Sequence, residues 1–433
     1  MKIAFYTLGC KVNAYETEAI REQFINAGYE IVDYSEYSDV YIVNSCMVTN
    51  SGERKSKQII RRPIKINPKA IIIVMGCLSQ LKAQQILDIT GVKIVLGTKN
   101  RHKIIEYLRE YLDNGLPINK VEELSTDEKF ENLAIHDFKN HKRAFLKIQD
   151  GCNNFCTYCI IPYARGRIRS KAKDIVLDEI KTLVKKGYIE IVLTGIHTGG
   201  YGEDFVDYSF AKLLSDIDKI QGIKRIRISS IEITEINEEV LTVIKASSKI
   251  VNHFHIPLQS GSKRMLKLMN RKYTKAEFKA KIDKIKKVFN QDVAITTDVI
   301  VGFPGETEEE FCETYDYIKA INFQELHVFP YSKRKGTPAD KMKDQVNGTI
   351  KKVRVKKLLE LSNQLKKAYI KTQLGKSKRV IIEQRKGEYL FGHSRDYLPV
   401  LVKASDDLIG KEVLVYLLKE DFPNVIAKYK NVL

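Results

Sequence analysis

Three cysteines in one short segment are the sequence feature that most limits the fold and chemistry of this chain. Cys152, Cys156 and Cys159 follow a C-x3-C-x2-C spacing, directly after residues 145–150, whose apolar and polar alternation predicts a strand. Three thiolates in a loop after a strand suit an iron–sulfur cluster, although such a cluster normally takes four protein thiolates. One iron would therefore be open to another molecule. The alternatives are an inert group of thiols or a zinc site, but the nearest histidines stand at no familiar zinc spacing.

Length and charge set the class of protein. A chain of 433 residues is too long for one ordinary core and predicts two or three domains. The excess of 19 basic over acidic residues creates a field that attracts polyanions such as nucleic acid or anionic lipid, unless it is only a lysine-rich solvated surface. No signal peptide or membrane-length apolar segment is evident, so we expect a cytoplasmic protein with no membrane partner. Its cysteines should then be ligands or catalysts.

Residues 1–113 alternate four times between strand and helix, which predicts an open parallel sheet. The predicted strands are 2–6, 39–43, 70–75 and 92–95. Cys10, Cys46 and Cys77 each follow one of the first three, where parallel sheets place ligands. The sequence thus predicts a second three-thiolate cluster, against the alternative of three small buried residues.

The rest of the chain divides into three parts. Residues 114–141 carry no clear period and predict a surface linker. Residues 142–371 alternate strand and helix around six predicted strands, which indicates a partial barrel with its active site at the carboxyl strand ends. Residues 372–433 contain four short β-rich runs and predict a small barrel. The isolated Cys312 is interpreted as a buried helix residue.

The cysteine loop after a strand resembles that of the radical S-adenosylmethionine (SAM) enzymes. In that family SAM chelates the fourth iron through its amino and carboxylate groups, and one electron from the cluster cleaves it to methionine and a 5′-deoxyadenosyl radical. The resemblance implies SAM-binding residues at the strand ends and in the cysteine loop. They are Tyr158, Thr194, Gly195, Ser230, Glu232, Gln259, Asp298 and Gly302.

Over essentially its whole length the chain resembles the methylthiotransferases. The matching motifs are Thr7–Asn13, Asn44–Cys46, Met75–Cys77, Asp150–Pro162 and Tyr331–Ala339. The resemblance implies an α/β protein with an amino-terminal open sheet, a radical SAM partial (β/α)6 barrel and a carboxyl-terminal barrel similar to the TRAM domain, a nucleic-acid-binding module. It also implies two [4Fe–4S] clusters, SAM as methyl donor and radical source, and transfer of methylthio to C2 of an adenine.

Two stretches bear on the substrate. Residues 193–202 and 229–232 resemble the enzyme that acts on N6-threonylcarbamoyladenosine beside the tRNA anticodon. The family member acting on isopentenyladenosine is the close alternative. A methylthiotransferase for a ribosomal protein would be repelled by its basic target. A non-catalytic iron–sulfur RNA-binding protein or redox sensor would leave the SAM-type strand ends without a purpose.

Two basic segments are predicted to bind tRNA. Arg165, Arg167 and Arg169 follow the cysteine loop and are placed to meet phosphates, or form a solvated face. Residues 341–371 predict a helix with ten cations against two carboxylates. Its expected RNA contacts are Lys351, Lys352, Lys356 and Lys357. We expect a monomer that works with tRNA and an external electron donor of the flavodoxin or ferredoxin type.

Overall fold

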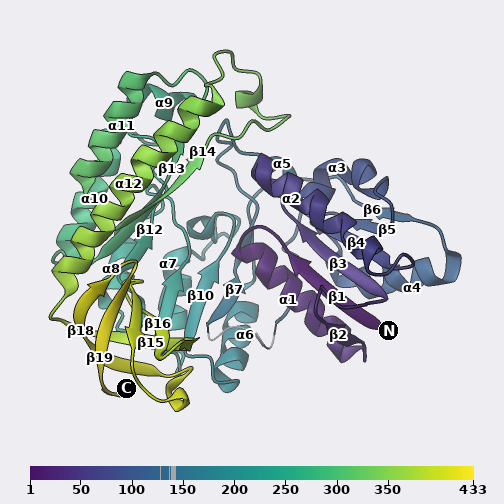
Figure 1. Ribbon diagram of the computed structural model, residues 1–433, viewed down its shortest axis with the longest axis horizontal. Coiled ribbons are helices and arrows are strands. Elements are labelled where there is room, and N and C mark those ends of the chain that lie inside the picture. The colour runs from purple at the N-terminus through teal and green to yellow at the C-terminus, as the bar shows by residue number, and fades with distance from the viewer. Residues whose placement is uncertain (127, 136, 138–142) are drawn as a thin grey trace.

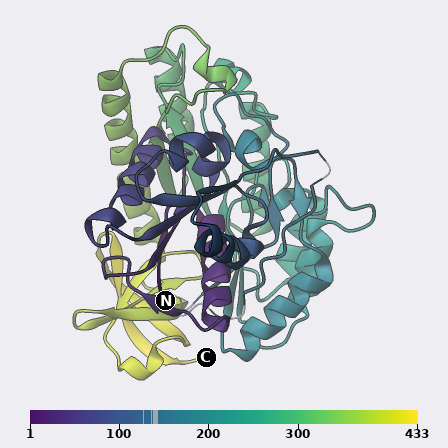
Figure 2. The same ribbon diagram turned by 90° about the vertical axis from the view of Figure 1, so that its right-hand side faces the viewer.

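The structure is a computed structural model that describes all residues except 127, 136 and 138–142. Figure 1 shows an amino-terminal sheet with its helices on the right, a larger strand-and-helix body on the left, and a small carboxyl-terminal barrel below that body. Turned by 90°, the amino-terminal sheet lies in front of the larger body (Figure 2). Within the described residues, no helix is long and apolar enough to cross a membrane.

The amino-terminal sheet is parallel, with strand order β2-β1-β3-β4-β5-β6. The four predicted strands are β1 (Lys2–Thr7), β3 (Val40–Ser45), β4 (Ile71–Gly76) and β5 (Val92–Leu96). Two short edge strands, β2 (Glu30–Val32) and β6 (Ile118–Lys120), were not predicted. Strands of three residues carry too few side chains for a hydrophobic period to be visible.

Helices cover both faces of this sheet, which is why its central strands are nearly continuous runs of Val and Ile. Helices α1 and α4 pack against one face through Ile20, Phe24 and Leu108. Helices α2 and α3 pack against the other face through Ile59, Ile60 and Leu78. The bounds are α1 (Lys11–Asn26), α2 (Asn50–Arg61), α3 (Cys77–Leu87) and α4 (Ile104–Asn114).

The larger body is the predicted partial barrel. Its six parallel strands form two three-stranded sheets, β11-β10-β7 and β12-β13-β14. The two sheets meet at a single bridge between Ile226 and Ile250. The strands are β7 (Ala144–Lys147), β10 (Glu190–Thr194), β11 (Arg225–Ile228), β12 (His253–His255), β13 (Ala294–Val301) and β14 (Glu325–Pro330).

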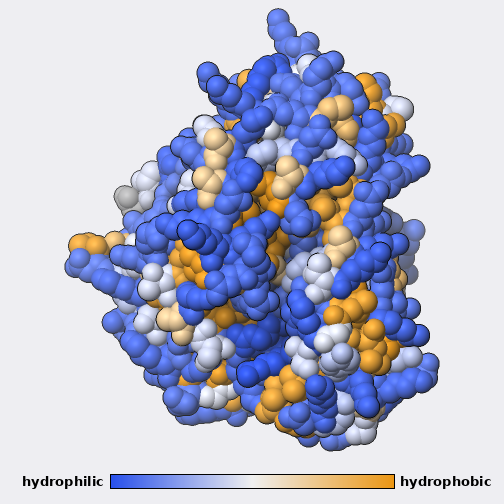
Figure 3. All heavy atoms as spheres, turned by 90° about the vertical axis from the view of Figure 1, so that its left-hand side faces the viewer, coloured by the Kyte–Doolittle hydropathy of each residue, from blue (hydrophilic) through white to orange (hydrophobic). Residues whose placement is uncertain are grey.

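Helices on the outside of the barrel bury one apolar face each against the strands. They are α6 (Lys173–Lys185), α7 (Phe210–Asp218), α8 (Glu238–Ala246), α10 (Lys275–Val288) and α11 (Glu308–Ile321). Cys312 lies on α11 and is exposed, so the prediction of a buried cysteine is wrong. The side of the molecule that carries α10 and α11 is largely hydrophilic, with hydrophobic side chains in separate groups (Figure 3).

The segment predicted as a surface linker is anchored at both ends. Its residues 118–120 form β6 of the amino-terminal sheet, and Leu133 and Ile135 are buried in the barrel core. Glu131 pairs with the buried Arg101 at 2.7 Å. The prediction of a wandering linker is therefore wrong for these residues. The predicted boundary at 141 and 142 lies outside the described residues.

Helix α12 (Gly348–Gln373) connects the two barrels, and its contacts run along β14. It begins seven residues after the predicted start at 341, because the preceding chain forms a short 3-10 turn (Pro338–Asp340) and a loop. Asn347 caps the helix by accepting a hydrogen bond from Thr349 N–H. Leu358, Leu361 and Leu365 bury its apolar face, whereas Val353, expected on the same face, is exposed.

The carboxyl-terminal barrel is closed in the order β15-β16-β17-β19-β18. Four of its strands match the predicted runs. Strand β16 was missed, because the residues after the tight turn at Gly387 were interpreted as part of the loop between two predicted strands. The strands are β15 (Ser377–Lys386), β16 (Tyr389–Ser394), β17 (Pro399–Val402), β18 (Glu412–Asp421) and β19 (Asn424–Val432).

A buried ion pair joins the two barrels. Arg225 of β11 is fully buried, and its Nε donates to Glu412 Oε1 of β18 at 2.7 Å. Its Nη1 and Nη2 donate to the carbonyls of His393 and Arg379, at 3.0 and 2.8 Å. All three nitrogens of the guanidinium thus bond to the carboxyl-terminal barrel.

We expect Glu412→Ala to lower the midpoint of thermal unfolding by roughly 10 °C, because an unpaired buried charge costs about 3–5 kcal/mol. Circular dichroism measures the midpoint. The control is Glu388→Ala, which removes an exposed pair with Lys403 in the same barrel and should shift it by less than about 2 °C. Equal shifts in both variants would contradict the assignment of Arg225 as the joint between barrels.

Candidate iron–sulfur and SAM site

The first cysteine set lies at one edge of the amino-terminal sheet. Strands β1, β3 and β4 are neighbours, and Cys10, Cys46 and Cys77 directly follow their carboxyl ends. Gly9, at φ +110°, makes this approach possible, since a Cβ there would lie 3.2 Å from Cys46 Cβ. Cys10 is exposed, Cys46 is half-buried and Cys77 is buried. The set therefore presents an open side at Cys10.

The second cysteine set occupies the loop between β8 (Gln149–Asp150) and α5 (Ile161–Arg165). Gly151, at φ +73°, starts the loop where a Cβ would lie 1.8 Å from the carbonyl oxygen of Arg167. The backbone N–H of Cys152 donates to the carbonyl of Gly166 at 3.0 Å. The Cys159 N–H donates to the Cys156 carbonyl at 2.9 Å. These bonds fix the curve of the loop around its thiols.

Arg165 joins the two sets. Its Nε donates to Cys77 Sγ at 3.3 Å, and its Nη1 donates to Glu16 Oε1 at 2.8 Å and to Asp150 Oδ1 at 3.1 Å. Its Nη2 donates to Asn13 Oδ1 at 2.9 Å. Arg165 belongs to the helix after the second set, whereas Asn13 and Glu16 belong to the helix after Cys10. One guanidinium therefore ties the two cysteine loops together.

The prediction that Arg165 meets tRNA phosphates is wrong, because this side chain is fully buried among carboxylates. Arg169 is also buried, 3.6 Å from Asp150 Oδ2, and the same correction applies to it. Arg167 is exposed, with its guanidinium 4.5 Å from the centre of the Phe155 ring. Of the three predicted arginines, only this one is free to contact RNA.

Burial and charge act against each other in this region. Burial alone would raise the pKa of Glu16, but Arg101, Arg165 and Lys147 hold it well below its usual range. Burial raises the pKa of the Cys77 thiol to about 11 and of the Cys152 and Cys159 thiols to about 12. Without metal these thiols keep their protons, and metal binding displaces them.

Four of the residues implied for SAM lie beside the second cysteine set. Thr194 accepts a hydrogen bond from Ile148 N–H at 2.9 Å, and a Cβ on Gly195 would lie 2.8 Å from Gln149 Oε1. Glu232 pairs with Arg271, whose Nη1 donates to Cys156 Sγ at 3.3 Å and to the Tyr158 hydroxyl at 3.4 Å. These residues surround one rim of the cysteine loop.

The other four lie farther along the strand ends. Ser230 is half-buried after β11. Gln259 is held at φ +66° beside Val299, and its buried Oε1 has no hydrogen-bond partner among the described residues. Asp298 bonds to His255 Nε2 at 3.1 Å and to His327 Nδ1 at 3.4 Å. Gly302, at φ +69°, lies against the Lys351 side chain, because a Cβ on Gly302 would be 2.4 Å from Lys351 Cγ. Among the described residues, none of these four forms a hydrogen bond or ion pair with the cysteine loop.

Two features of the site were not predicted. Arg271, which follows α9 (Lys263–Leu268), bonds to both Cys156 and Glu232, yet nothing in its local sequence distinguishes it from a surface arginine. His197 contacts Asn154 of the cysteine loop at 3.0 Å and pairs with Glu235. Burial lowers the pKa of His197, but the bond with Glu235 outweighs it and raises the value overall.

The basic face of α12 is partly neutralised by other elements. Arg354 is buried and pairs with Glu306 at 2.6 Å and with Glu308 at 3.1 Å. Lys357 also pairs with Glu308, at 3.3 Å. Of the four predicted RNA contacts, Lys352 is exposed, and Lys356 and Lys357 are exposed but paired, Lys356 with Glu360 at 4.0 Å. Lys351 is half-buried, with Nζ 3.2 Å from the Tyr331 carbonyl.

Comparisons with known proteins agree with this architecture. Residues 146–318 match the model of the Radical SAM superfamily, and residues 2–97 match that of the uncharacterized protein family UPF0004. The chain is 51% identical over 427 residues to the threonylcarbamoyladenosine tRNA methylthiotransferase MtaB of Bacillus subtilis (strain 168), covering 97% of this chain and 94% of the relative. It belongs to the methylthiotransferase family of radical SAM enzymes.

Two further relatives place the chain within this family. The MtaB protein of Aquifex aeolicus is 40% identical, over 88% of this chain and 93% of the relative. The tRNA-2-methylthio-N(6)-dimethylallyladenosine synthase of Acetivibrio thermocellus is 38% identical, over 94% of this chain and 87% of the relative. The radical SAM methyltransferase TsrM of Kitasatospora setae shares the fold, with a TM-score of 0.58 at 12% identity over 78% of this chain and 73% of TsrM.

The two cysteine sets fit the clusters that this family implies. Each offers three thiols and no fourth protein thiol, because Cys312 on α11 is the remaining cysteine of the chain and stands apart from both. Each also receives a guanidinium N–H on one sulfur, from Arg165 and Arg271 respectively. Such hydrogen bonds stabilise negative charge on cluster sulfurs and help to set the reduction potential.

We expect Arg165→Gln to reduce the iron bound by the first cysteine set, because Cys77 loses its donor and Glu16 and Asp150 lose a shared cation. Iron is measured per chain after anaerobic reconstitution, in a background where Cys152, Cys156 and Cys159 are changed to Ala. Arg167→Gln, which alters an exposed side chain nearby, is the control. Unchanged iron content in Arg165→Gln would contradict this role.

Proposed function

We propose that this chain transfers a methylthio group to C2 of N6-threonylcarbamoyladenosine beside the anticodon of tRNA. The observation that carries the reaction type is the pair of three-cysteine sets joined through Arg165. The choice of nucleoside rests on similarity to MtaB proteins, since the Bacillus subtilis MtaB is 51% identical and the dimethylallyladenosine synthase named above is 38% identical.

Two cofactor sites are needed because the reaction has two parts. A C2–H bond of adenine has no acidic proton for a base to remove, so a cofactor must supply radical chemistry. Cys152, Cys156 and Cys159 would hold the cluster that cleaves SAM, and the other cysteine set would hold the cluster that carries the sulfur. Thr194, Gly195 and Glu232 lie where SAM would meet the cluster held by Cys152, Cys156 and Cys159.

The buried charges hold the two sites in register. Arg165 fixes the distance between the cysteine loops, and Arg271 fixes Glu232 against Cys156. Gln259, with its unpartnered Oε1, offers a hydrogen-bond acceptor to a bound amino or hydroxyl group. In this proposal the small barrel and the exposed lysines of α12 bind tRNA. An external electron donor reduces the cluster that cleaves SAM.

Lys11 is the side chain best placed to bind the carboxylate that distinguishes this nucleoside. It directly follows Cys10, is exposed, and has no carboxylate within 4.0 Å among the described residues. Desolvation by the surrounding protein, together with the charges of Arg143 and Arg227 of the barrel, lowers the pKa of its ammonium group to about 8, so the group still carries its charge at neutral pH. A base whose C2 approaches the first cysteine set brings its N6 substituent within reach of this ammonium group. An isopentenyl group would gain nothing from such a cation.

The two cysteine sets should separate the two half-reactions. Cys152→Ala is expected to abolish SAM cleavage, whereas the triple change of Cys10, Cys46 and Cys77 to Ala should still cleave SAM without methylthiolation. Release of 5′-deoxyadenosine and mass spectrometry of tRNA nucleosides measure the two outcomes. Methylthiolation by the triple variant would overturn the assignment of the first set.

Lys11→Met should lower kcat/KM for the threonylcarbamoylated tRNA by about 10- to 100-fold, because a hydrogen bond to a charged group contributes about 1.5–3 kcal/mol. SAM cleavage without tRNA should not change. The control is Lys69→Met, an exposed lysine just before β4 at the opposite edge of the sheet. Turnover of isopentenylated tRNA alone, by the unmodified chain, would reject the proposed nucleoside.

A further inference from the structure

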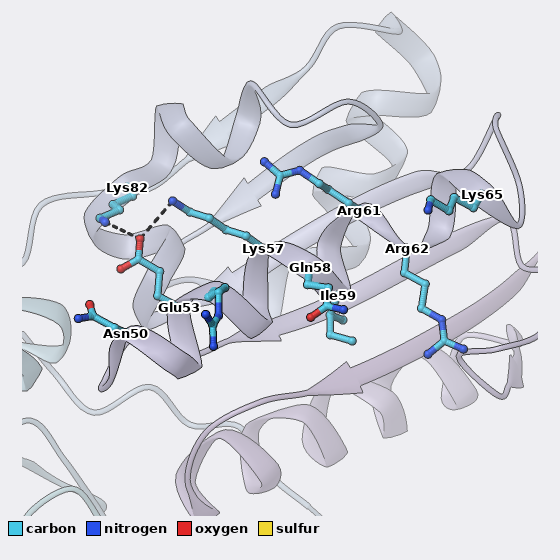
Figure 4. Close-up of a pocket in the computed structure, with 10 residues that line it drawn as sticks. Asn50, Glu53, Lys57, Gln58, Ile59, Arg61, Arg62, Lys65 and Lys82 are labelled. Atoms are coloured by element: carbon cyan, nitrogen blue, oxygen red, sulfur yellow. Dashed lines mark hydrogen bonds and ion pairs between the residues drawn. The ribbon is translucent and has the colours of Figure 1, made fainter. Parts of the chain in front are cut away.

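The exposed face of α2 carries a concentration of positive charge that the sequence analysis did not single out. It lines a pocket of about 1100 Å³ (Figure 4). Six cations and one carboxylate contribute to the lining. The cations are Arg54, Lys57, Arg61, Arg62, Lys65 and Lys82, and the carboxylate is Glu53. In the close-up, Arg61 and Lys57 extend from one side of the helix, and Arg62 extends from its end.

Most of this charge is not neutralised within the protein. Glu53 pairs with Lys82 at 2.6 Å and with Lys57 at 3.1 Å. In the described part of the chain, none of the other four cations of the pocket has a carboxylate within 4.0 Å. Cations four residues apart on a helix, such as Lys57 and Arg61, repel each other. This arrangement contrasts with α12, where Glu306 and Glu308 neutralise the cations beside them.

The same helix covers the first cysteine set. Ser56 Oγ accepts a hydrogen bond from Cys46 N–H at 3.1 Å and donates to the Cys46 carbonyl at 2.9 Å. A Cβ on Gly52 would lie 3.6 Å from Cys46 Sγ. One face of α2 therefore closes over the proposed sulfur-carrying site, while the opposite face presents its cations to solvent over about 18 Å of helix.

The charged face continues onto the larger body. The backbone N–H of Asn50 donates to Ser332 Oγ at 2.8 Å, and Arg334 Nη1 donates to Glu53 Oε2 at 2.9 Å. The neighbouring Tyr331 carbonyl accepts from Lys351 Nζ at 3.2 Å. Exposed Lys335 and Lys352 belong to the same stretch. Together these contacts link α2, the loop 331–337 and the start of α12 into one surface.

We infer that the exposed face of α2 binds the phosphate backbone of the tRNA whose base enters the site. The inference rests on the proposed function for the identity of the RNA and adds where its backbone runs. Unpaired cations spread along a helix match a chain of phosphates in charge and spacing. Since Cys46 lies beneath the same helix, nucleotides that flank the modified base would pass along its outer face.

The test reverses three exposed cations of α2 and its carboxyl end. Arg54→Glu, Arg61→Glu and Arg62→Glu together should flatten the slope of log affinity against log salt by about 2–3 units, since each lost phosphate contact removes about 0.9. Affinity for threonylcarbamoylated tRNA near 50 mM salt should fall by at least about 10-fold. Iron content and SAM cleavage without tRNA should stay the same.

The matched control carries the same change in net charge elsewhere in the amino-terminal domain. It combines Lys93→Glu, Lys103→Glu and Arg109→Glu, from β5 and the α4 region. The control should bind tRNA within about 3-fold of the unmodified chain, with less change in slope. Equal losses in both triple variants would overturn the inference, because net charge alone would then explain them.

Two further outcomes separate the inference from the proposed function. If the unmodified chain binds tRNA and the α2 variant keeps its affinity and salt slope, the inference is wrong and the proposed function stands. If the unmodified chain does not bind or modify the tRNA, the proposed function fails first. Vesicles containing phosphatidylserine provide the other test: loss of vesicle binding with intact tRNA binding would assign the α2 face to a membrane surface and reject RNA.

Discussion

The arrangement of both cysteine sets depends on one buried guanidinium. Arg165 lies among Glu16, Asp150 and Asn13 and also donates to Cys77, so it bonds to residues beside both cysteine sets. Burying such charges is costly unless every partner is present, and removing one partner leaves the others uncompensated. The stable state of this cluster is therefore also the state in which the two loops stand at a fixed separation. Stability and function are linked at this residue.

Sequence patterns predicted the strands and helices that follow a hydrophobic period. They did not predict side-chain pairs between residues far apart in the chain. Central strands and their helices follow visible periods, so the sheet edge with Cys10, Cys46 and Cys77 could be located in advance. Arg165 was misplaced because a basic residue after a polar loop resembles a surface residue until Glu16, far away in the chain, is found against it. Arg271 carries no local signal at all. The anchoring of Leu133 was missed for the same reason, since tertiary contacts alone define its position.

Net charge was an incomplete guide to where RNA would bind. The predicted helix had ten cations, yet Arg354 is buried against Glu306, and Lys366 pairs with Glu325 of the neighbouring strand. On α2, by contrast, Arg54, Arg61 and Arg62 have no such partners in the described part of the chain. What distinguishes the two helices is the carboxylates that the fold brings beside them, which a count along one segment cannot reveal.

The single bridge between β11 and β12 gives the larger barrel a mechanical seam. One half carries the cysteine loop, and the other carries Gln259 and Asp298, so the contact between the halves sets how far apart these residues lie. The carboxyl-terminal barrel braces this seam from outside, because Arg225 on one side bonds to Glu412 and Gln324 on the other side donates to the Asp396 carbonyl at 3.1 Å. The small barrel therefore contacts both halves, and a shift in its position would act on both of them.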